Sequence, residues 1–217
     1  MIEIKGLAKK FKNELVINYK DYKFEDNKKY ILLGASGCGK STLLNMMSGI
    51  ISPTRGQVFI DGKEITSESQ HAKDSFRIKN IGYIFQDFKL IEEMTIMDNI
   101  NVLRIEGIDT SGTAELLKKL GMYNKRNKKI KELSGGEKQR VAIVRALVKN
   151  PDIILADEPT GNLNFSIGET VIKELTEVSK AKTLIVVSHD ERLTKYFDVV
   201  INMNGMTSSY EEETKNA

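Results

Sequence analysis

The sequence predicts an α/β fold with a mixed, mainly parallel sheet core, an antiparallel β region and an inserted helical subdomain. Three observations predict it. The first third of the chain alternates short β-type runs with turn signals, residues 87–150 show helical patterns, and two strand-length apolar runs flank a helical stretch beyond residue 150. Strands that alternate with helices favour a parallel sheet covered by those helices.

The β-type runs of the first third are short and bounded by turns. They are Ile2–Ile4, Leu15–Tyr19, Tyr30–Leu33 and Val58–Ile60, the last followed by the turn pair Asp61-Gly62. This spacing predicts a small, mainly antiparallel β region around one core strand.

The rest of the chain carries helices and a second set of strands. Thr113–Leu120 and Glu137–Lys149 are the best helical segments, and Ile153–Ala156 and Leu184–Val187 flank a helical stretch near Glu169–Ser179, as in a βαβ unit. We therefore expect one domain over residues 1–217. Its α/β core with the antiparallel region covers 1–86 and 151–210, its helical subdomain covers 87–150, and 211–217 form a flexible tail.

Composition excludes several classes of protein. Hydrophobic residues make up 40% and charged residues 29% of the chain, as in soluble globular proteins. No apolar run approaches the roughly 18 residues of a spanning helix, and the first residues lack a secretory signal. One cysteine permits no internal disulfide, and a net charge of +3 with mixed signs gives no reason to expect a nucleic-acid partner.

A glycine-rich loop follows the apolar run Ile31–Leu33 and precedes the helical run Ser41–Ser48. Its residues fit the phosphate-loop pattern: Gly34, Ala35, Ser36, Gly37, Cys38, Gly39, Lys40 and Ser41. Backbone N–H groups and the helix N-terminus would bind the β-phosphate, Lys40 would reach the β- and γ-phosphates, and the Ser41 hydroxyl would bind Mg²⁺. The alternative is a glycine-rich turn that binds nothing, which the flanking strand and helix disfavour.

Two adjacent acids, Asp157 and Glu158, end the apolar run Ile153–Ala156. In a phosphate-loop enzyme the first carboxylate would accept from Mg²⁺-bound water and the second would act as general base toward the attacking water. Acids at a strand end are also common as solvated caps. Together with the phosphate loop, the catalytic interpretation is favoured.

The run Leu133–Arg140 begins a helix that ends before Pro151. Ser134 and Glu137 have the spacing of a capping box, which any helix can use. A capping box does not need Gly135 and Gly136, however, and these leave the N–H groups of the helix start open to an anion. The run therefore predicts a second phosphate-binding site.

The order Gly34–Ser41, Gln86, Leu133–Glu137, Asp157-Glu158 and His189 resembles the nucleotide-binding domain of ABC ATPases over roughly residues 1–205. The resemblance implies a P-loop NTPase fold of the ABC ATPase type, with ATP and Mg²⁺ as ligands. It also implies a head-to-tail homodimer in which each ATP lies between Lys40 of one subunit and Ser134, Gly135 and Gly136 of the other.

The resemblance assigns further roles by position. Gln86 would reach Mg²⁺ and the attacking water, His189 would contact the γ-phosphate, and Phe11 would stack on adenine, where the family more often has Tyr. Alternatively, His189 is a surface residue and Phe11 a core residue. Catalysis is thus expected of Glu158, His189, Gln86 and Lys40, and metal binding of Ser41, Gln86 and Asp157. Nucleotide binding is expected of residues 34–42, which include Thr42, and of Phe11, Ser134, Gly135, Gly136 and Glu137. Bound ATP should also cover the Cys38 thiol.

A membrane permease is the second partner that the resemblance implies, docked near residues 86–97 at the cytoplasmic face of the membrane. Phe88–Met97 is apolar enough for such a contact, although the alternative is that most of these side chains form the core of the helical subdomain, which is expected of Ile96 and Met97. Ala156–Leu163 resembles the branch that serves lipoprotein release, macrolide or antimicrobial-peptide export, and cell division. A cell-division-type regulator that transports nothing is the alternative function, and DNA-repair or ribosome-binding members fit less well. Asn164 replaces the family's usual Asp.

Overall fold

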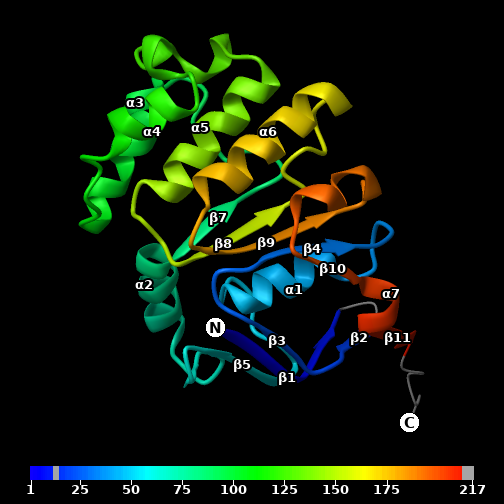
Figure 1. Ribbon diagram of the computed structural model, residues 1–217. Coiled ribbons are helices and arrows are strands. Elements are labelled where there is room, and N and C mark those ends of the chain that lie inside the picture. Colours follow the sequence, from blue (N-terminus) through cyan, green and yellow to red (C-terminus); the bar gives the residue numbers. More distant parts are fainter. Residues whose placement is uncertain (12–14, 212–217) are drawn as a thin grey trace.

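The computed structural model describes residues 1–11 and 15–211, and it divides into two sheets with helices between and above them (Figure 1). Of the predicted tail, 211–217, Glu211 belongs to a strand because its backbone pairs with Leu15, and residues 212–217 lie outside the described residues. One sheet is antiparallel, in the order β11-β2-β1-β5-β6 with β3 paired to β1. Its strands are β1 (Ile2–Lys10), β2 (Leu15–Tyr19), β3 (Tyr22–Phe24), β5 (Arg55–Ile60), β6 (Lys63–Glu64) and β11 (Thr207–Glu211).

The second sheet is parallel throughout, in the order β10-β4-β9-β8-β7. Its strands are β4 (Lys29–Leu33), β7 (Ile81–Ile84), β8 (Ile153–Asp157), β9 (Thr183–Ser188) and β10 (Val199–Asn202). Both faces of this sheet are buried, since alternate residues of β8 join different cores: Ile153 and Leu155 one, Ile154 and Ala156 the other. This explains why the central strands read as continuous apolar runs.

Helix α1 (Lys40–Met47) fills the space between the two sheets, where Leu43, Leu44, Met46 and Met47 are buried against both (Figure 1). Helices α5 (Gly135–Leu147) and α6 (Phe165–Val178) cover the other face of the parallel sheet. The remaining helices are α2 (Gln70–Asn80), α3 (Ile96–Asn101), α4 (Thr113–Lys119), α7 (Met203–Met206) and the 3₁₀ turns η1 (Val102–Glu106), η2 (Tyr123–Lys125), η3 (Ile130–Glu132) and η4 (Glu191–Tyr196).

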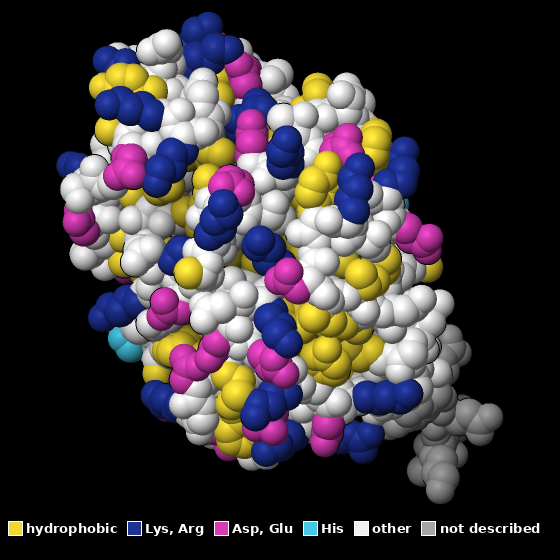
Figure 2. Space-filling model, in the orientation of Figure 1, with side chains coloured by type: hydrophobic (Ala, Val, Ile, Leu, Met, Phe, Trp, Pro, Cys, Tyr) yellow, Lys and Arg dark blue, Asp and Glu magenta, His cyan; other side chains and the backbone are white. Residues whose placement is uncertain are grey.

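The antiparallel region is larger than predicted, because the polar strand β11 returns from the C-terminal end of the chain to pair with β2. Lys, Arg, Asp and Glu side chains are interspersed over the face seen in Figure 2, so neither sign of charge dominates it. Among the residues that the structure describes, no helix is both long and apolar enough to cross a membrane.

Candidate functional site

The glycine-rich loop joins β4 to α1 and is held by the antiparallel sheet. Gly39 immediately precedes α1 with a φ of +97°, and a Cβ there would lie 2.6 Å from the Tyr19 hydroxyl oxygen. That hydroxyl donates a hydrogen bond to the Gly39 carbonyl (2.9 Å), and burial raises the pKa of Tyr19 so that it remains a donor. Only glycine fits this close approach and left-handed conformation.

A cavity of about 730 Å³ opens over this loop and α1. It brings together residues from five separate stretches of the chain, which are Phe11, Leu15, Ile17, Ser36, Gly37, Gly39, Lys40, Ser41, Thr42, Gln86, Glu158, Gly161 and His189. Phe11 and Leu15 also pack against the core of the antiparallel sheet. Both interpretations of Phe11 therefore agree with its position, since it contacts the core and lines the cavity.

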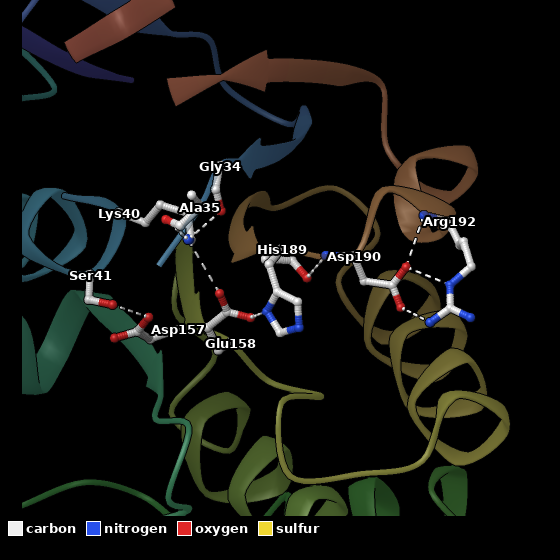
Figure 3. Close-up of polar contacts among 10 residues, drawn as sticks. Gly34, Ala35, Lys40, Ser41, Asp157, Glu158, His189, Asp190 and Arg192 are labelled. Atoms are coloured by element: carbon white, nitrogen blue, oxygen red, sulfur yellow. Dashed lines mark hydrogen bonds and ion pairs between the residues drawn. The ribbon is translucent and has the colours of Figure 1, made fainter. Parts of the chain in front are cut away.

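Lys40 and Glu158 lie close together in this cavity (Figure 3). The Lys40 ammonium donates to the carbonyls of Gly34 (2.7 Å) and Ala35 (2.9 Å), and it lies 3.5 Å from Glu158 Oε1. The other carboxylate oxygen, Oε2, is 2.9 Å from His189 Nδ1. Glu158 is therefore held between an ammonium and an imidazole, with a side chain that is only 12% exposed.

The backbone at Glu158 is unusual, because its φ of 42° is left-handed. Its N–H donates to the Val187 carbonyl (3.1 Å) and its carbonyl accepts from Gly161 N–H (3.0 Å). A left-handed non-glycine residue costs about 1–2 kcal/mol and persists only where its surroundings fix it. These two bonds fix it, and they aim the carboxylate into the cavity.

Asp157, the last residue of β8, accepts a 2.7 Å hydrogen bond from the Ser41 hydroxyl at the start of α1 (Figure 3). Burial raises the pKa of the Asp157 carboxyl, and the bond from Ser41 opposes that shift. Hydroxyl and carboxylate oxygens are the hard ligands that Mg²⁺ takes in phosphate-binding sites. The donor set formed by Ser41, Asp157 and the nearby Gln86 amide fits this ion.

Gln86 follows β7 and is tied to the loop that follows Glu158. Its carbonyl accepts from the Asn162 side-chain amide (2.9 Å), and its own Nε2 lies 3.1 Å from where a Cβ on Gly161 would stand. A larger residue than glycine at position 161 would press against the Gln86 amide. The loops after β7 and β8 are therefore joined at the cavity.

The helix start at residues 134–137 forms the predicted capping box. Ser134 Oγ accepts from Glu137 N–H (3.4 Å), Glu137 Oε2 accepts from Ser134 N–H (2.9 Å), and the Lys125 ammonium pairs with Glu137 and lowers the pKa of that carboxyl. The two glycines also allow close packing within the subunit. A Cβ on Gly135 would lie 3.0 Å from Leu163 Cδ2, and a Cβ on Gly136 would lie 2.6 Å from Ile167 Cγ2.

The structure does not gather every predicted residue into one cavity. Ser134, Gly135, Gly136 and Glu137, all described, are not among the residues that line it. Cys38 instead lines a neighbouring cavity of about 260 Å³ with Asn204 and Thr207, and this second cavity shares Leu15, Ile17 and Gly37 with the first. The expectation that ATP covers this thiol is therefore not supported, although the Cys38 backbone remains part of the loop.

Sequence reasoning missed several residues that shape the site. Tyr19 buttresses the loop, Leu15 and Ile17 line the cavity, and Asn162 joins the two loops. Asn164 is the N-cap of α6, where its side chain accepts from Ile167 N–H (3.0 Å). Asn and Asp are about equally good N-caps, so this capping role does not need the missing charge. The signal for it, Asn before an apolar periodic run, was available in the sequence.

Comparisons with known proteins identify the family of this chain. Residues 17–161 match the ABC transporter family. The chain is 42% identical to the ABC transporter ATP-binding protein Rv0986 of Mycobacterium tuberculosis, over 88% of this chain and 79% of that protein. It is 36% identical to the lipoprotein-releasing system ATP-binding protein LolD of Syntrophotalea carbinolica, over 94% of both. A dimeric, post-hydrolysis structure of the ATP-binding cassette MJ0796 with ADP and Pi matches with a TM-score of 0.82 at 34% identity, over 93% of this chain and 94% of that one. The chain thus belongs to the ABC transporter family, and its domain is an ABC ATPase.

Proposed function

We propose that this chain is the ATP-binding and ATP-hydrolysing subunit of a bacterial ABC transporter, which dimerises on ATP and drives a conformational change in a membrane permease. The observation that carries the proposal is the convergence of Lys40, Ser41, Gln86, Glu158 and His189 on one cavity. Such a set can hold a triphosphate and activate water beside it.

ATP would enter with its phosphates toward the glycine-rich loop. The N–H groups of this loop and of the α1 N-terminus favour an anion, and the Lys40 ammonium would donate to the β- and γ-phosphate oxygens. Phe11, Leu15 and Ile17 offer apolar surface for the adenine in the same cavity. Ser41, Asp157 and Gln86 would hold Mg²⁺, which neutralises phosphate charge when bound.

Hydrolysis would use Glu158 as the general base. The carboxylate would take a proton from water as the water oxygen bonds to the γ-phosphorus and the bond to the bridging oxygen breaks, giving ADP and phosphate. His189, 2.9 Å from Glu158, would orient the carboxylate and contact the γ-phosphate. Lys40 would stabilise the charge on the transferring group.

A head-to-tail dimer would complete each site. The N-terminus of α5, with Gly135 and Gly136, is a suitable anion site, yet it does not line the cavity of its own chain. A second subunit could place that helix end on the ATP bound near Lys40. The MJ0796 cassette, which is a dimer bound to ADP and Pi, supports the dimeric part of this proposal.

The permease would dock near residues 86–97 at the cytoplasmic face of the membrane. Ile91 and Met94 are 47% and 37% exposed there, as a docking surface requires. Ile96 is fully buried and Met97 packs against the core, so neither belongs to that surface. We infer a role in export or resistance, for antimicrobial peptides, macrolides or lipoproteins, from the resemblance of Ala156–Leu163 and the LolD relatives.

The direct test is ATP hydrolysis by the purified chain and by Lys40→Ala. Removing the ammonium should abolish hydrolysis and weaken nucleotide binding, because Lys40 is the one lysine or arginine within residues 34–42 and is the charge aimed at the β- and γ-phosphates. An unchanged rate in the variant would refute the assignment of the site. With the permease reconstituted, hydrolysis that moves no substrate would favour the cell-division-type regulator instead.

A further inference from the structure

The segment that follows Gln86 has a strained backbone. Phe88 and Lys89 both adopt left-handed conformations, with φ of 59° and 49°. Side chains with a Cβ disfavour this region, and two such residues in succession are rarer still. Within the segment, Phe88 N–H donates to Phe85 O (3.2 Å) and Lys89 N–H to Asp87 O (2.6 Å). A turn of this kind needs support from elsewhere in the fold.

Arg145, near the end of α5, supplies that support. Its Nη2 donates to the Phe88 carbonyl at 2.7 Å and its Nη1 donates to the Lys89 carbonyl. Burial lowers the pKa of Arg145, but a guanidinium remains protonated in proteins. Its planar pair of donors matches two successive carbonyls, which the single ammonium of a lysine cannot do.

A second contact ties the same helix to the same segment. Lys138 of α5, the residue after the capping-box member Glu137, pairs with Glu92 at 2.8 Å. The start of α5 also lies against the loop after Glu158, where Gly135 approaches Leu163, and against the first turn of α6, where Gly136 approaches Ile167. Helix α5 thus contacts both loops that carry Gln86 and Glu158 to the cavity.

We propose that Arg145 is a positioning residue for Gln86. By holding the left-handed turn at Phe88 and Lys89, it sets where the Gln86 side chain enters the cavity and links that position to α5. A displacement at the start of α5, or at residues 86–97, would then reach Gln86 through Arg145. The inference rests on the proposed function only in assigning Gln86 a part in hydrolysis.

The first readout needs no activity. Hydrogen exchange in the full chain should accelerate at residues 86–92 in Arg145→Gln, because the turn loses its two donors. Arg104→Gln is the matched control, since Arg104 lies in η1 and donates to Thr110 Oγ1 within the helical subdomain. Its exchange at 86–92 should match the wild type. Unchanged exchange in Arg145→Gln would overturn the proposal.

The second readout is a double-mutant cycle on hydrolysis with Gln86→Ala. Arg145→Gln should lower kcat by about 10- to 100-fold, as small misplacements of catalytic groups do. The nucleotide Kd should stay within about threefold, because Lys40 and the loop are untouched. If Arg145 acts through Gln86, the double variant should hydrolyse within about twofold of Gln86→Ala alone. If the fold-losses in kcat of the two single variants instead multiply in the double variant, Arg145 acts through a group other than Gln86.

Two further variants separate positioning from general stability. Lys89→Gly should restore part of the rate in the Arg145→Gln background, because glycine adopts the left-handed turn without support. Arg145→Lys keeps the charge but has a single donor group, so its kcat and its exchange rates at residues 86–92 should lie between those of the wild type and Arg145→Gln. This variant also keeps the proposal testable if Arg145→Gln folds poorly. A wild-type rate in Gln86→Ala would instead count against the proposed role of Gln86, independently of the exchange result.

Discussion

Glu158 Oε2 lies 2.9 Å from His189 Nδ1, so these two side chains contact one another directly in the cavity (Figure 3). The contact joins the ends of two neighbouring parallel strands, β8 and β9. Because Glu158 has a fixed left-handed backbone and a second partner in Lys40, its carboxylate has little freedom to turn away. If this carboxylate is the general base, the rate of hydrolysis should fall sharply when its charge is removed.

Glu158→Gln is expected to slow hydrolysis by roughly 10²- to 10⁴-fold while leaving ATP binding intact, since the amide keeps the shape but cannot accept the proton. Unhydrolysed ATP should then hold two subunits together between Lys40 and the partner's helix start. Light scattering with saturating Mg-ATP measures this. A variant that binds ATP and remains monomeric would contradict the head-to-tail dimer.

Gly136→Ala is expected to lower the free energy of unfolding by about 1–3 kcal/mol, because the new methyl group would overlap Ile167 Cγ2. Urea unfolding measures the effect. Gly112→Ala is the matched control, since Gly112 precedes α4 with a φ of −70° and no atom within 4 Å of the new Cβ, and it should change stability by less than about 0.5 kcal/mol.

Ile167→Ala in the Gly136→Ala background then tests the cause. Shortening the clashing side chain should recover most of the lost stability if the overlap is responsible. A double variant that is less stable than Gly136→Ala alone would show that the glycine is needed for another reason.

Much of the fold could be predicted from the sequence where local pattern and burial agree. The strands β2, β4, β8 and β9 and the helices α1, α4 and α5 begin and end close to their predicted bounds. Helix α2 was missed because its sequence is polar and buries only Lys73, so it has no apolar stripe. Strand β11 was missed because Thr207–Glu211 is a polar edge strand.

The site likewise contains residues that could be predicted from the sequence and residues that could not. The phosphate-loop pattern could be predicted because its chemistry depends on local spacing, and the structure gathers Lys40, Ser41, Gln86, Glu158 and His189 in one cavity. The contact of Arg145 with Phe88 and Lys89 spans 57 and 56 residues and depends on two backbone carbonyls, which no side-chain pattern reports. The direction of the Cys38 thiol depends on loop conformation and was likewise not predictable.

Lys149 should make stability depend on pH in the alkaline range. Its ammonium donates to the Arg77 and Ile78 carbonyls at the end of α2, and burial, with a smaller contribution from Arg77, lowers the pKa of Lys149 from 10.5 to about 8. Between these pH values the unfolded chain binds a proton that the folded chain has lost. The free energy of unfolding should therefore rise with pH, by at most about 1.4 kcal/mol per pH unit.

Comparison with Lys149→Met isolates this contribution, because all other groups titrate alike in both proteins. Urea unfolding at several pH values should give parallel curves below about pH 7, with the wild type gaining stability relative to the variant between about pH 8 and 10. Parallel curves over the whole range would mean that the Lys149 pKa is the same in the folded and unfolded chains.

Cys38 tests which way the glycine-rich loop faces. Cys38 lines the smaller cavity with Asn204 and Thr207 and is not among the residues that line the neighbouring cavity with Lys40 and Glu158. A maleimide should therefore label Cys38 at rates that agree within about twofold with and without Mg-ATP, because Cys38 does not line the cavity in which the nucleotide is proposed to bind. Cys38 is the single cysteine of the chain, so intact-protein mass spectrometry reports this one site. In the structure Cys38 Sγ lies close to Gly34, since a Cβ built on Gly34 would be only 2.7 Å from that sulfur. Strong protection by Mg-ATP would instead mean that the thiol leaves this position and turns toward the nucleotide.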